Sequence, residues 1–384
     1  MKICLICPHF LPHIGGGEQL VYDIAKNLLA EGHEVRVVSS NSGGVTGHVP
    51  YEGIDSYYYN WKLMFGHPVV KKKDLAEHIR WAEIVHTAVF TPARPSLKLA
   101  RKYGKPCMVT VHEVIGDKWY WFVKPKWKAF AFKWFEHHVC KPDYDAVHVV
   151  SDSTKRDFEQ YIGKRDGLIR VYNSSHMPPA EAYIGEKIDF REHFGLQDGE
   201  KGFLYFGRPS VNKGVFVLEE AIAELRKRGA LTGDMKFCFL LAAQPADVRR
   251  DLLARMEKDG ITENVVIRDS VPRMSLFKLI SGADYVIVPS ITEGFGFCAV
   301  ETCAIGRPII HSDGGSLPEV VFGRTLSFKN RDASDLANCL EKVQKEGTDA
   351  FAVIPEKKFE EKEMTAQIME IYRKLYAERT GNGL

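Results

Sequence analysis

A glycine-rich turn lies between two carboxylates in the stretch Ser290-Ile291-Thr292-Glu293-Gly294-Phe295-Gly296-Phe297-Cys298-Ala299-Val300-Glu301. The residues before it, Tyr285-Val286-Ile287-Val288-Pro289, are apolar and free of charge, which predicts a strand buried on both faces of a parallel sheet. Gly294 and Gly296 let the backbone N–H groups of the turn face outward, and the apolar spacing from Phe297 to Ile305 predicts a helix. The N-terminus of such a helix attracts anions because its first N–H groups lack partners, so phosphate is the expected ligand.

The two carboxylates require hydrogen-bond donors as partners, since acids beside a phosphate would otherwise repel it. Hydroxyl groups next to a phosphate describe a nucleotide sugar. We therefore expect Glu293 to hold hydroxyls of the sugar and Glu301, about two helical turns further on, to face a ribose. The alternative is that Glu301 only pairs on its helix and that the glycines only make a tight turn, because two acids at one spacing are a weak pattern.

Other turns follow apolar runs in the same way. Downstream, Gly306-Arg307-Pro308-Ile309-Ile310 ends the helix and begins another strand, and the turn at 313–319 opens a short helix. Upstream, the run Phe203–Gly207 is followed by Arg208 and Lys213. Two fixed cations beyond the end of a strand can stabilise the charge that a diphosphate gains as it leaves a sugar. The alternative is that both are surface charges at the start of a helix.

These motifs, in this order, resemble glycosyltransferase family 4, which includes bacterial glycogen synthases, sucrose-phosphate synthases and phosphatidylinositol mannosyltransferases. The resemblance covers most of the chain and rests on Gly-Arg…Lys-Gly at 207–214, Pro-Ser-x-x-Glu-Gly-Phe-Gly at 289–296, the second glutamate at 301, Gly-x-Pro at 306–308 and Gly-Gly-x-x-Pro-Glu at 314–319. It implies an α/β GT-B fold, in which two Rossmann-like doubly wound parallel-sheet domains face a cleft. It also implies catalytic roles for Arg208, Lys213 and Glu293, and donor contacts from Gly294, Phe295, Gly296, Phe297 and Glu301.

The first loop, residues 8–18, follows an apolar strand, contains three consecutive glycines and opens a helix. It is not the dinucleotide fingerprint G-x-G-x-x-G, but glycines at a helix start let a diphosphate or an acceptor approach the backbone closely. A merely flexible turn is the alternative. By family resemblance, Gly16 and Gly17 line the donor site, and His112, at the end of another strand, touches the donor sugar. Without the family, a single histidine at a strand end indicates only a satisfied polar residue.

Composition limits the class of protein. The 384 residues, of which 45% are hydrophobic, suffice for two globular domains. Net charge is only +2, but residues 1–175 hold 24 Lys and Arg against 18 Asp and Glu, and the remainder holds 28 against 32, which suggests different partners for the two halves. The eight cysteines lack regular spacing, and Cys4 and Cys7 fall in the first apparent strand, so we expect reduced core thiols in a cytoplasmic protein. No apolar run approaches the roughly 18 residues that span a bilayer, and residues 1–12 do not resemble a signal peptide.

Short apolar runs alternate with helical patterns along the chain, which predicts doubly wound parallel sheets. The runs are Ile3–Cys7, Glu34–Ser39, Ile84–Thr87, Cys107–Val111, Ala146–Val150, Leu168–Tyr172, Phe203–Gly207, Lys236–Leu241, Val265–Arg268, Tyr285–Pro289 and Pro308–His311. We predict an N-terminal acceptor-side Rossmann-like domain over 1–176, an interdomain connection over 177–196, a C-terminal nucleotide-sugar-binding Rossmann-like domain over 197–355 and, by family resemblance, a helix over 356–384 that crosses back to the N-terminal domain. Parallel sheets bind ligands beyond the carboxyl ends of their strands, so the ligand is expected between the domains.

The predicted reaction moves a sugar from a UDP-, GDP- or ADP-sugar to a glycan or polyprenyl-linked acceptor in cell-surface polysaccharide or glycolipid synthesis. The resemblance implies retention at the anomeric carbon. No cofactor is expected, and no metal, because Arg208 and Lys213 can neutralise the diphosphate. The alternatives are a sugar-nucleotide epimerase of the same fold and a non-catalytic nucleotide-sugar-binding subunit. An NAD oxidoreductase is disfavoured because the first loop lacks the dinucleotide fingerprint.

A basic, aromatic band covers Lys98–Lys141, where ten Lys and Arg face three acids, and residues 118–135 hold nine aromatics, including four of the six tryptophans. If Pro125 starts a helix, aromatic side chains cover two adjacent faces with lysines at their edges. Lysine and tryptophan both favour the headgroup region of a membrane. The band therefore predicts peripheral binding to the inner face of the cytoplasmic membrane through residues 118–135. The alternative is that these aromatics pack inside the domain, and nucleic acid is not expected as a partner given the near-neutral charge.

Overall fold

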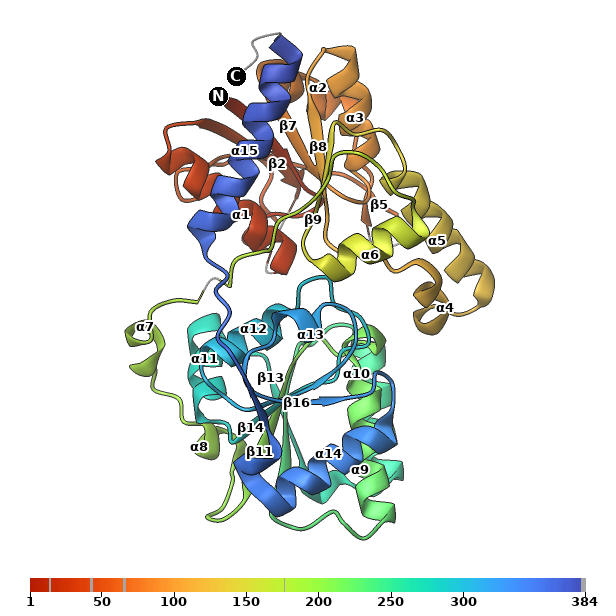
Figure 1. The fold of residues 1–384 in the computed structure, drawn as a ribbon, viewed down its shortest axis with the longest axis vertical. Helices are drawn as coiled ribbons and strands as arrows, with labels where there is room; N and C mark the ends of the chain where they lie inside the picture. Colours follow the sequence, from red (N-terminus) through yellow and green to blue (C-terminus); the bar gives the residue numbers. More distant parts are fainter. Residues whose placement is uncertain (14, 42–43, 65–66, 176, 381–384) are drawn as a thin grey trace. The chain divides into compact units, whose positions relative to one another are not determined.

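The computed structural model describes the chain except for residues 14, 42–43, 65–66, 176 and 381–384. It divides into two units (Figure 1). Unit 1 comprises Met1–Ser174 together with Phe359–Leu384, and unit 2 comprises Ser175–Lys358. The C-terminal segment therefore belongs to the same unit as the N-terminus.

The sheet of unit 1 has eight strands in the order β10-β9-β8-β7-β1-β2-β4-β3, and its pairings are parallel except for β3 with β4. The strands are β1 Lys2–Ile6, β2 Glu34–Ser40, β3 Gly47–His48, β4 Asp55–Tyr59, β7 Ile84–Ala88, β8 Cys107–Val111, β9 Ala146–Val149 and β10 Leu168–Arg170. A separate hairpin is formed by β5 (Leu63–Met64) and β6 (His67–Pro68). The strand order reverses between β1 and β7, which makes the loops after these strands the expected place for a ligand.

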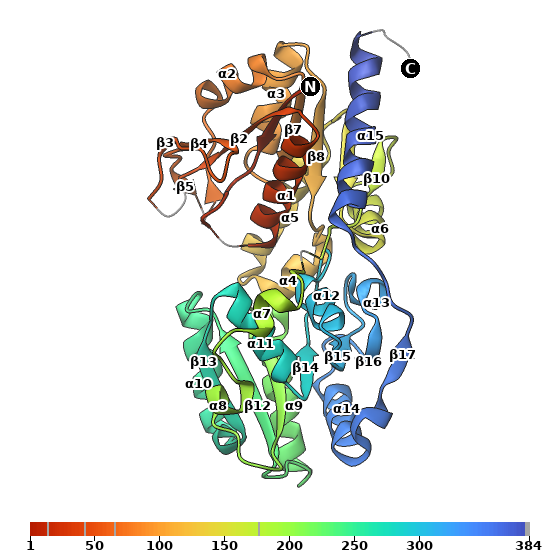
Figure 2. The ribbon, with the colours of Figure 1, turned by 90° about the vertical axis from the view of Figure 1, so that its left-hand side faces the viewer.

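Helices cover both faces of this sheet because successive strand residues point to opposite sides. On one face, Cys4 and Ile6 share a core with four helices, α2 (Lys72–Trp81), α3 (Ala93–Lys102), α5 (Lys126–Cys140) and α6 (Asp152–Tyr161). On the other face, Ile3 and Leu5 share a core with α1 (Gly16–Ala30) and the C-terminal helix α15 (Glu361–Thr380), which lie near each other in Figure 2. The hydrophobic core of unit 1 is thus completed by the last helix of the chain.

A chain of buried hydrogen bonds ties α15 to the sheet. The hydroxyl of Tyr372 donates to Nδ1 of His86 at 2.6 Å, and Nε2–H of His86 donates to the hydroxyl oxygen of Thr110 at 2.6 Å. Thr110 donates in turn to Nδ1 of His148 at 2.9 Å, and Nε2–H of His148 donates to the carbonyl of Val171 at 2.9 Å. The carbonyl can only accept, so every donor meets an acceptor when both imidazoles are neutral. Burial lowers the pKa of His86 to about 3 and the pKa of His148 to about 4, which agrees with neutral rings.

We expect this chain of hydrogen bonds to make the protein less stable on acidification. Both folded pKa values lie below the ordinary 6.5, so between about pH 6.5 and pH 3 the unfolded chain binds protons that the folded chain does not. The free energy of unfolding should therefore fall by up to about 1.4 kcal/mol per histidine for each pH unit. Because glutamine cannot be protonated, His86→Gln should flatten this slope relative to the parent protein in denaturant titrations at a series of pH values. An identical slope in parent and His86→Gln contradicts the prediction.

The sheet of unit 2 has seven strands in the order β13-β12-β11-β14-β15-β16-β17, parallel except for β16 with β17. The strands are β11 Lys201–Gly207, β12 Met235–Leu241, β13 Val265–Asp269, β14 Tyr285–Val288, β15 Ile309–Ser312, β16 Gly323–Phe328 and β17 Ala352–Ile354. Helix α9 (Val215–Lys227) contacts α10 (Ala246–Lys258) and α14 (Ala333–Glu346), while α11 (Arg273–Gly282) and α12 (Phe297–Ala304) lie on the other side of the sheet (Figure 1). The prediction of two doubly wound, mainly parallel sheets is confirmed.

Residues 177–196 carry two short helices, α7 (Glu181–Ile184) and α8 (Phe190–Phe194), and they cluster with unit 2. Phe190 is buried in a space that two glycines leave open. A Cβ added at Gly202 or Gly282 would lie 2.4 or 2.6 Å from its side chain. The segment is therefore packed onto unit 2 along part of its length.

The sequence predicted reduced core thiols and no membrane-spanning segment. All eight cysteines are free, and Cys4 and Cys7 are buried as expected for core thiols. Among the described residues, no helix has both the length and the apolar character required to cross a membrane.

Candidate functional site

Two loops meet in unit 2 where the strand order reverses. The neighbouring strands β11 and β14 are followed by helices on opposite sides of the sheet, and doubly wound sheets bind ligands at such a point. The loop after β11 carries Arg208 and Lys213, and the loop after β14 carries Glu293. The loops are joined directly, because the N–H of Ile291 donates to the carbonyl of Asn212 at 2.8 Å.

Gly214 makes this close approach of the two loops possible. Its φ is +69°, and a Cβ placed on it would lie 1.7 Å from the carbonyl oxygen of Pro289. Any other residue would push the loops apart and would be strained in this backbone conformation. Glycine is therefore required at this position of the Lys-Gly motif, because it allows Lys213 to lie next to the second loop.

Glu293 is a buried acceptor in this cluster, with 9% of its surface exposed. Its Oε1 accepts from Nζ of Lys213 at 2.6 Å and from the hydroxyl of Ser290 at 2.7 Å. The loop after β15 holds its backbone, because the N–H of Ser316 donates to the Glu293 carbonyl at 3.1 Å and a Cβ on Gly315 would lie 2.5 Å from the Glu293 nitrogen. Within the described part of the chain no donor is within hydrogen-bond distance of the second oxygen, Oε2.

Glu301 lies in α12 and is 4% exposed. Its Oε1 accepts from Nη2 of Arg273 at 2.7 Å, and the Arg273 guanidinium lies 4.9 Å from the ring centroid of Phe277. Arg273 begins α11, shortly after β13 ends. Arg273 was not among the predicted site residues, because a helix start carries no local signal for a partner 28 residues away. The ion pair fixes the direction of the Glu301 carboxylate.

The turn between the two glutamates begins α12 as the sequence predicted. Gly296 is the N-cap residue, with φ +89° in the left-handed region that favours glycine. Phe295 is buried and meets Phe297 edge-on, with ring centroids 5.2 Å apart, and Gly294 is partly exposed. The N–H groups of Ala299 and Val300 donate to the Gly296 carbonyl at 3.0 and 3.1 Å, so the hydrogen bonds of α12 begin at this glycine.

Arg208 differs from Lys213 in its surroundings. It is exposed, directly after β11, and its backbone carbonyl accepts from the hydroxyl of Tyr205 at 3.3 Å. Within the ranges that the structure describes, no carboxylate lies within ion-pair distance of its guanidinium. Unit 2 thus offers one cation held by a carboxylate and a second cation without one.

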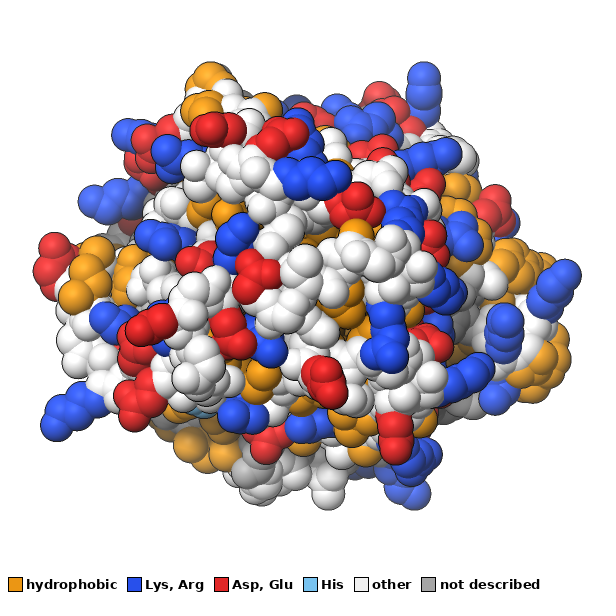
Figure 3. Space-filling model, turned by 90° about the horizontal axis from the view of Figure 1, so that it is seen from below, with side chains coloured by type: hydrophobic (Ala, Val, Ile, Leu, Met, Phe, Trp, Pro, Cys, Tyr) orange, Lys and Arg blue, Asp and Glu red, His pale blue; other side chains and the backbone are white. Residues whose placement is uncertain are grey.

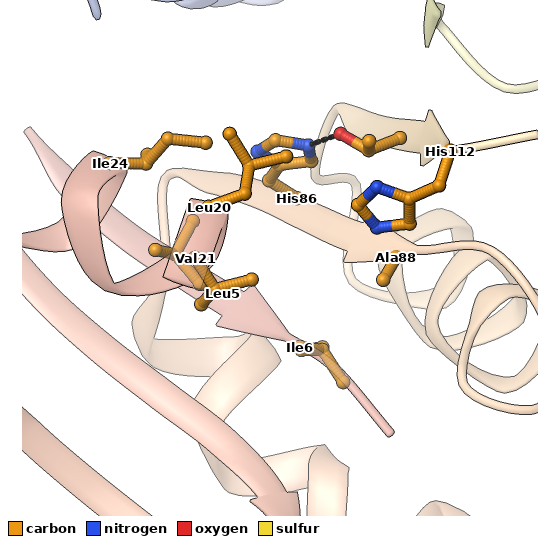
Figure 4. Close-up of a pocket in the computed structure, with 9 residues that line it drawn as sticks. Leu5, Ile6, Leu20, Val21, Ile24, His86, Ala88 and His112 are labelled. Atoms are coloured by element: carbon orange, nitrogen blue, oxygen red, sulfur yellow. Dashed lines mark hydrogen bonds between the residues drawn. The ribbon is translucent and has the colours of Figure 1, made fainter. Parts of the chain in front are cut away.

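Gly16, Gly17 and His112 belong to unit 1. Gly16 begins α1, and a Cβ added to Gly17 would lie 3.6 Å from Nε2 of His112. His112 and His86 line a small pocket, whose other walls are mainly apolar side chains of β1 and α1 (Figure 4). Burial, followed by the nearby His148, lowers the pKa of His112 to about 4. A neutral imidazole offers one donor and one acceptor to a sugar hydroxyl.

Clustered carboxylates are the side chains that would hold a metal ion at such a site. Among the described residues, no group of three or more His, Cys, Asp or Glu could hold a metal ion. The chain has one Asp-x-Asp spacing, Asp143-Tyr144-Asp145. Asp145 accepts from the N–H of Cys107 at 2.7 Å, and Asp143 accepts from Arg165 at 3.1 Å, so both have partners within unit 1.

Comparison with known proteins gives matches over both units. The family model for Glycosyltransferase Family 4 matches residues 14–174, and the model for Glycosyl transferases group 1 matches residues 200–346. The chain is 26% identical over 343 residues to an uncharacterized glycosyltransferase of Methanocaldococcus jannaschii, covering 84% of this chain and 83% of the relative. It is 25% identical over 324 residues to the GDP-mannose:cellobiosyl-diphosphopolyprenol alpha-mannosyltransferase of Xanthomonas campestris, covering 82% and 79%.

One solved structure extends the comparison to the fold. Sucrose-phosphate synthase from Thermosynechococcus elongatus is similar with a TM-score of 0.77 at 18% sequence identity, over 98% of this chain and 99% of that one. This likeness bears on the fold alone, and it confirms the predicted GT-B fold.

Proposed function

We propose that this chain, which belongs to glycosyltransferase family 4 and is a glycosyltransferase, transfers a glycosyl unit from a nucleoside-diphosphate sugar with retention and without a metal ion. The observation that carries this proposal is the contact between Lys213 and Glu293 at the strand-order reversal of unit 2. A cation next to a buried carboxylate, beside a helix N-terminus, matches a ligand that has phosphate and hydroxyl groups side by side.

The proposed reaction needs charge stabilisation more than it needs a protein nucleophile. The acceptor oxygen bonds to the anomeric carbon on the face from which the diphosphate departs, the carbon–oxygen bond to the diphosphate breaks, and the hydroxyl proton passes to a diphosphate oxygen. Arg208 and Lys213 stabilise the charge that develops on the diphosphate, which is the part a metal ion would otherwise take. Glu293, whose Oε1 is already bonded to Lys213 and Ser290, holds a sugar hydroxyl through Oε2.

The proposed acceptor is a lipid-linked glycan in cell-surface polysaccharide or glycolipid synthesis. The Xanthomonas relative is named for a cellobiosyl-diphosphopolyprenol acceptor and a GDP-mannose donor, and it aligns over most of both chains. An acceptor of this kind lies at a membrane surface, so the proposal includes peripheral association with the inner face of the cytoplasmic membrane. The basic N-terminal half of the sequence supports this part of the proposal.

A panel of donors tests the proposed function. UDP-glucose, GDP-mannose and ADP-glucose are added to the protein, and at least one should raise its unfolding midpoint, because a ligand at about 100 times its Kd adds about 2.7 kcal/mol to the free energy of unfolding. With that donor and a polyprenyl-diphosphate glycan, the product should keep the anomeric configuration of the donor, and a chelator should leave the rate unchanged. If no nucleotide sugar stabilises the protein, the donor assignment is wrong; an inverted product or a chelator-sensitive rate refutes the mechanism.

A further inference from the structure

Helix α5 exposes a row of large aromatic side chains. Trp127, Phe130 and Trp134 follow the i, i+3, i+7 spacing of one helix face, and they are 67%, 61% and 57% exposed. These three residues form what we call the aromatic face of α5. Trp121 of the adjoining short helix α4 (Trp119–Phe122) is also exposed, at 42%. Single exposed apolar residues are ordinary on protein surfaces, but a continuous aromatic row marks an interaction site.

The opposite side of α5 is firmly packed, so the aromatic face has no role in the core. Ala129 and Val139 are buried there, and the buried carboxylate of Glu136 accepts from the N–H groups of Ile115 and Gly116 at 2.8 and 2.7 Å. Ile115 ends the loop that begins at His112, and Gly116 begins the single 3-10 turn that follows this loop. The helix that carries the aromatic face therefore also holds the loop of a predicted donor-site residue.

The lysines around the aromatic face fall into two groups. Lys118 pairs with Asp157 at 2.7 Å, and Lys133 pairs with Asp117. By contrast, three exposed lysines at 124, 126 and 128 have no carboxylate within ion-pair distance in the described part of the chain. Positions 126 and 128 lie about 100° to either side of position 127 on the helix, so these lysines flank the aromatic row.

The space-filling view agrees with this grouping of aromatic and basic side chains. At the right-hand edge of Figure 3, the side on which α4 and α5 lie in Figure 1, hydrophobic and basic side chains lie together. Over the rest of the face shown, acidic and basic side chains are interspersed. A surface that combines aromatic rings with uncompensated positive charge is complementary to an anionic lipid bilayer, where rings enter the boundary of the acyl chains and ammonium groups meet the headgroups.

We infer that the aromatic face of α5, with the lysines at 124, 126 and 128, is the surface by which this protein binds anionic membranes. The inference deepens the proposed function, on whose lipid-linked acceptor it rests. Glu136 of the same helix accepts hydrogen bonds from the backbone that follows His112. When α5 binds the membrane, this loop is therefore attached to a helix that lies at the lipid surface. A second copy of the chain and a nucleic acid are the other occupants of such a surface, and each has its own outcome in the test.

The test compares sedimentation with vesicles of phosphatidylcholine alone and vesicles that also contain phosphatidylglycerol, without any donor sugar. At low salt the protein should sediment with the anionic vesicles, with a blue shift of tryptophan emission, and high salt should release it. The triple variant Lys124→Gln, Lys126→Gln, Lys128→Gln should bind on the order of 10²-fold more weakly, since each lysine near the surface contributes roughly fivefold. Trp127→Gln with Phe130→Gln should weaken vesicle binding and reduce the blue shift, to which Trp134 still contributes.

A matched control separates this surface from general basicity. Lys71, Lys72 and Lys73 are also exposed in the same unit, and their triple glutamine variant removes the same charge. It should bind the anionic vesicles like the parent. Equal weakening in both triple variants, or no preference for phosphatidylglycerol at low salt, overturns the inference. So does a change from dimer to monomer in Trp127→Gln, which would assign the face to a second copy, or binding of single-stranded DNA through the same lysines.

Failure of the membrane-binding inference can be distinguished from failure of the proposed glycosyl transfer. Transfer to a short-chain acceptor in detergent does not require a bilayer, so the lysine triple variant should retain it. Loss of vesicle binding with transfer retained supports the inference. Vesicle binding without transfer in the parent protein contradicts the proposed function and leaves the membrane surface in place.

Discussion

Arg208→Ala and Lys213→Ala are each expected to lower kcat by about 10²-fold or more. A fixed cation stabilises charge that develops on the leaving diphosphate, and water must reorganise to do the same, so losing one such group costs this much in comparable sites. Steady-state kinetics measure the effect, with the nucleotide sugar that raises the unfolding midpoint as the donor. Circular dichroism establishes that the variants are folded. Because the charge develops in the transition state, kcat should fall more than the affinity for donor changes.

The two substitutions differ in what they leave behind. Arg208 is exposed and has no carboxylate partner within the described residues, so its removal deletes only the charge. Lys213→Ala also leaves the buried Glu293 without its cation, and it should therefore lower the free energy of unfolding as well. Arg250→Ala, at an exposed arginine on α10, serves as the control and should leave kcat unchanged. If folded Arg208→Ala and Lys213→Ala both turn over at the parent rate, the diphosphate assignment is wrong.

The central strands could be predicted from the sequence, because each is a short apolar run buried on both faces. The edge strands β10 and β13 also overlap predicted runs, Leu168–Tyr172 and Val265–Arg268, whereas β3 and β4 at the other edge of the first sheet, and β16 and β17 at the other edge of the second, were not predicted. β4, with the sequence Asp-Ser-Tyr-Tyr-Tyr, alternates partly exposed and buried positions, and β16, with Gly-Arg-Thr-Leu-Ser-Phe, is buried at only two of its six positions, so both carry polar residues. Their apolar content is too low for a run-based prediction, and their pairing partners are decided by the tertiary fold.

In the candidate site, too, some residues can be predicted from the local sequence and others only from partners that are distant in the sequence. Lys213, Glu293 and Gly296 lie in motifs whose glycines are required by the backbone, so the local sequence carries the signal. Arg273 and Tyr372 are recognisable only by their partners, since Tyr372 meets His86 across 286 residues of sequence. Such pairs depend on which helix packs against which strand, and no spacing within the sequence reports that.

The aromatic band left two interpretations open in the sequence, burial or a membrane-facing surface, and the structure divides the residues between them. Phe135 is partly buried against the core of unit 1, and Phe132 is partly buried and stacks on Trp119 with ring centroids 5.0 Å apart. Trp127 and Trp134 point away from that core and are more than half exposed. Composition alone could not make this division, because it depends on which face of α5 meets the sheet.

Glu301→Gln and Glu293→Gln should separate the two parts of the donor. Glu301, fixed by Arg273, is assigned to the ribose, so Glu301→Gln should weaken binding of the free nucleoside diphosphate. Glu293 is assigned to the sugar, so Glu293→Gln should leave that binding nearly unchanged and lower the rate of transfer. A hydrogen bond to a charged group contributes about 1.5–3 kcal/mol, which corresponds to a roughly 10- to 150-fold change in Kd.

Titration calorimetry with the free nucleoside diphosphate measures the first effect, and steady-state kinetics with the complete donor measure the second. Arg273→Gln is the companion variant: because it removes the group that orients Glu301 without removing the carboxylate, it should weaken nucleotide binding less than Glu301→Gln does. A 2′-deoxyribose analogue should lose affinity for the parent protein but little for Glu301→Gln, since the carboxylate that would meet the hydroxyl is already altered. Equal loss of nucleotide binding in the two glutamate variants, or no loss in either, removes both assignments, because then neither carboxylate distinguishes ribose from sugar.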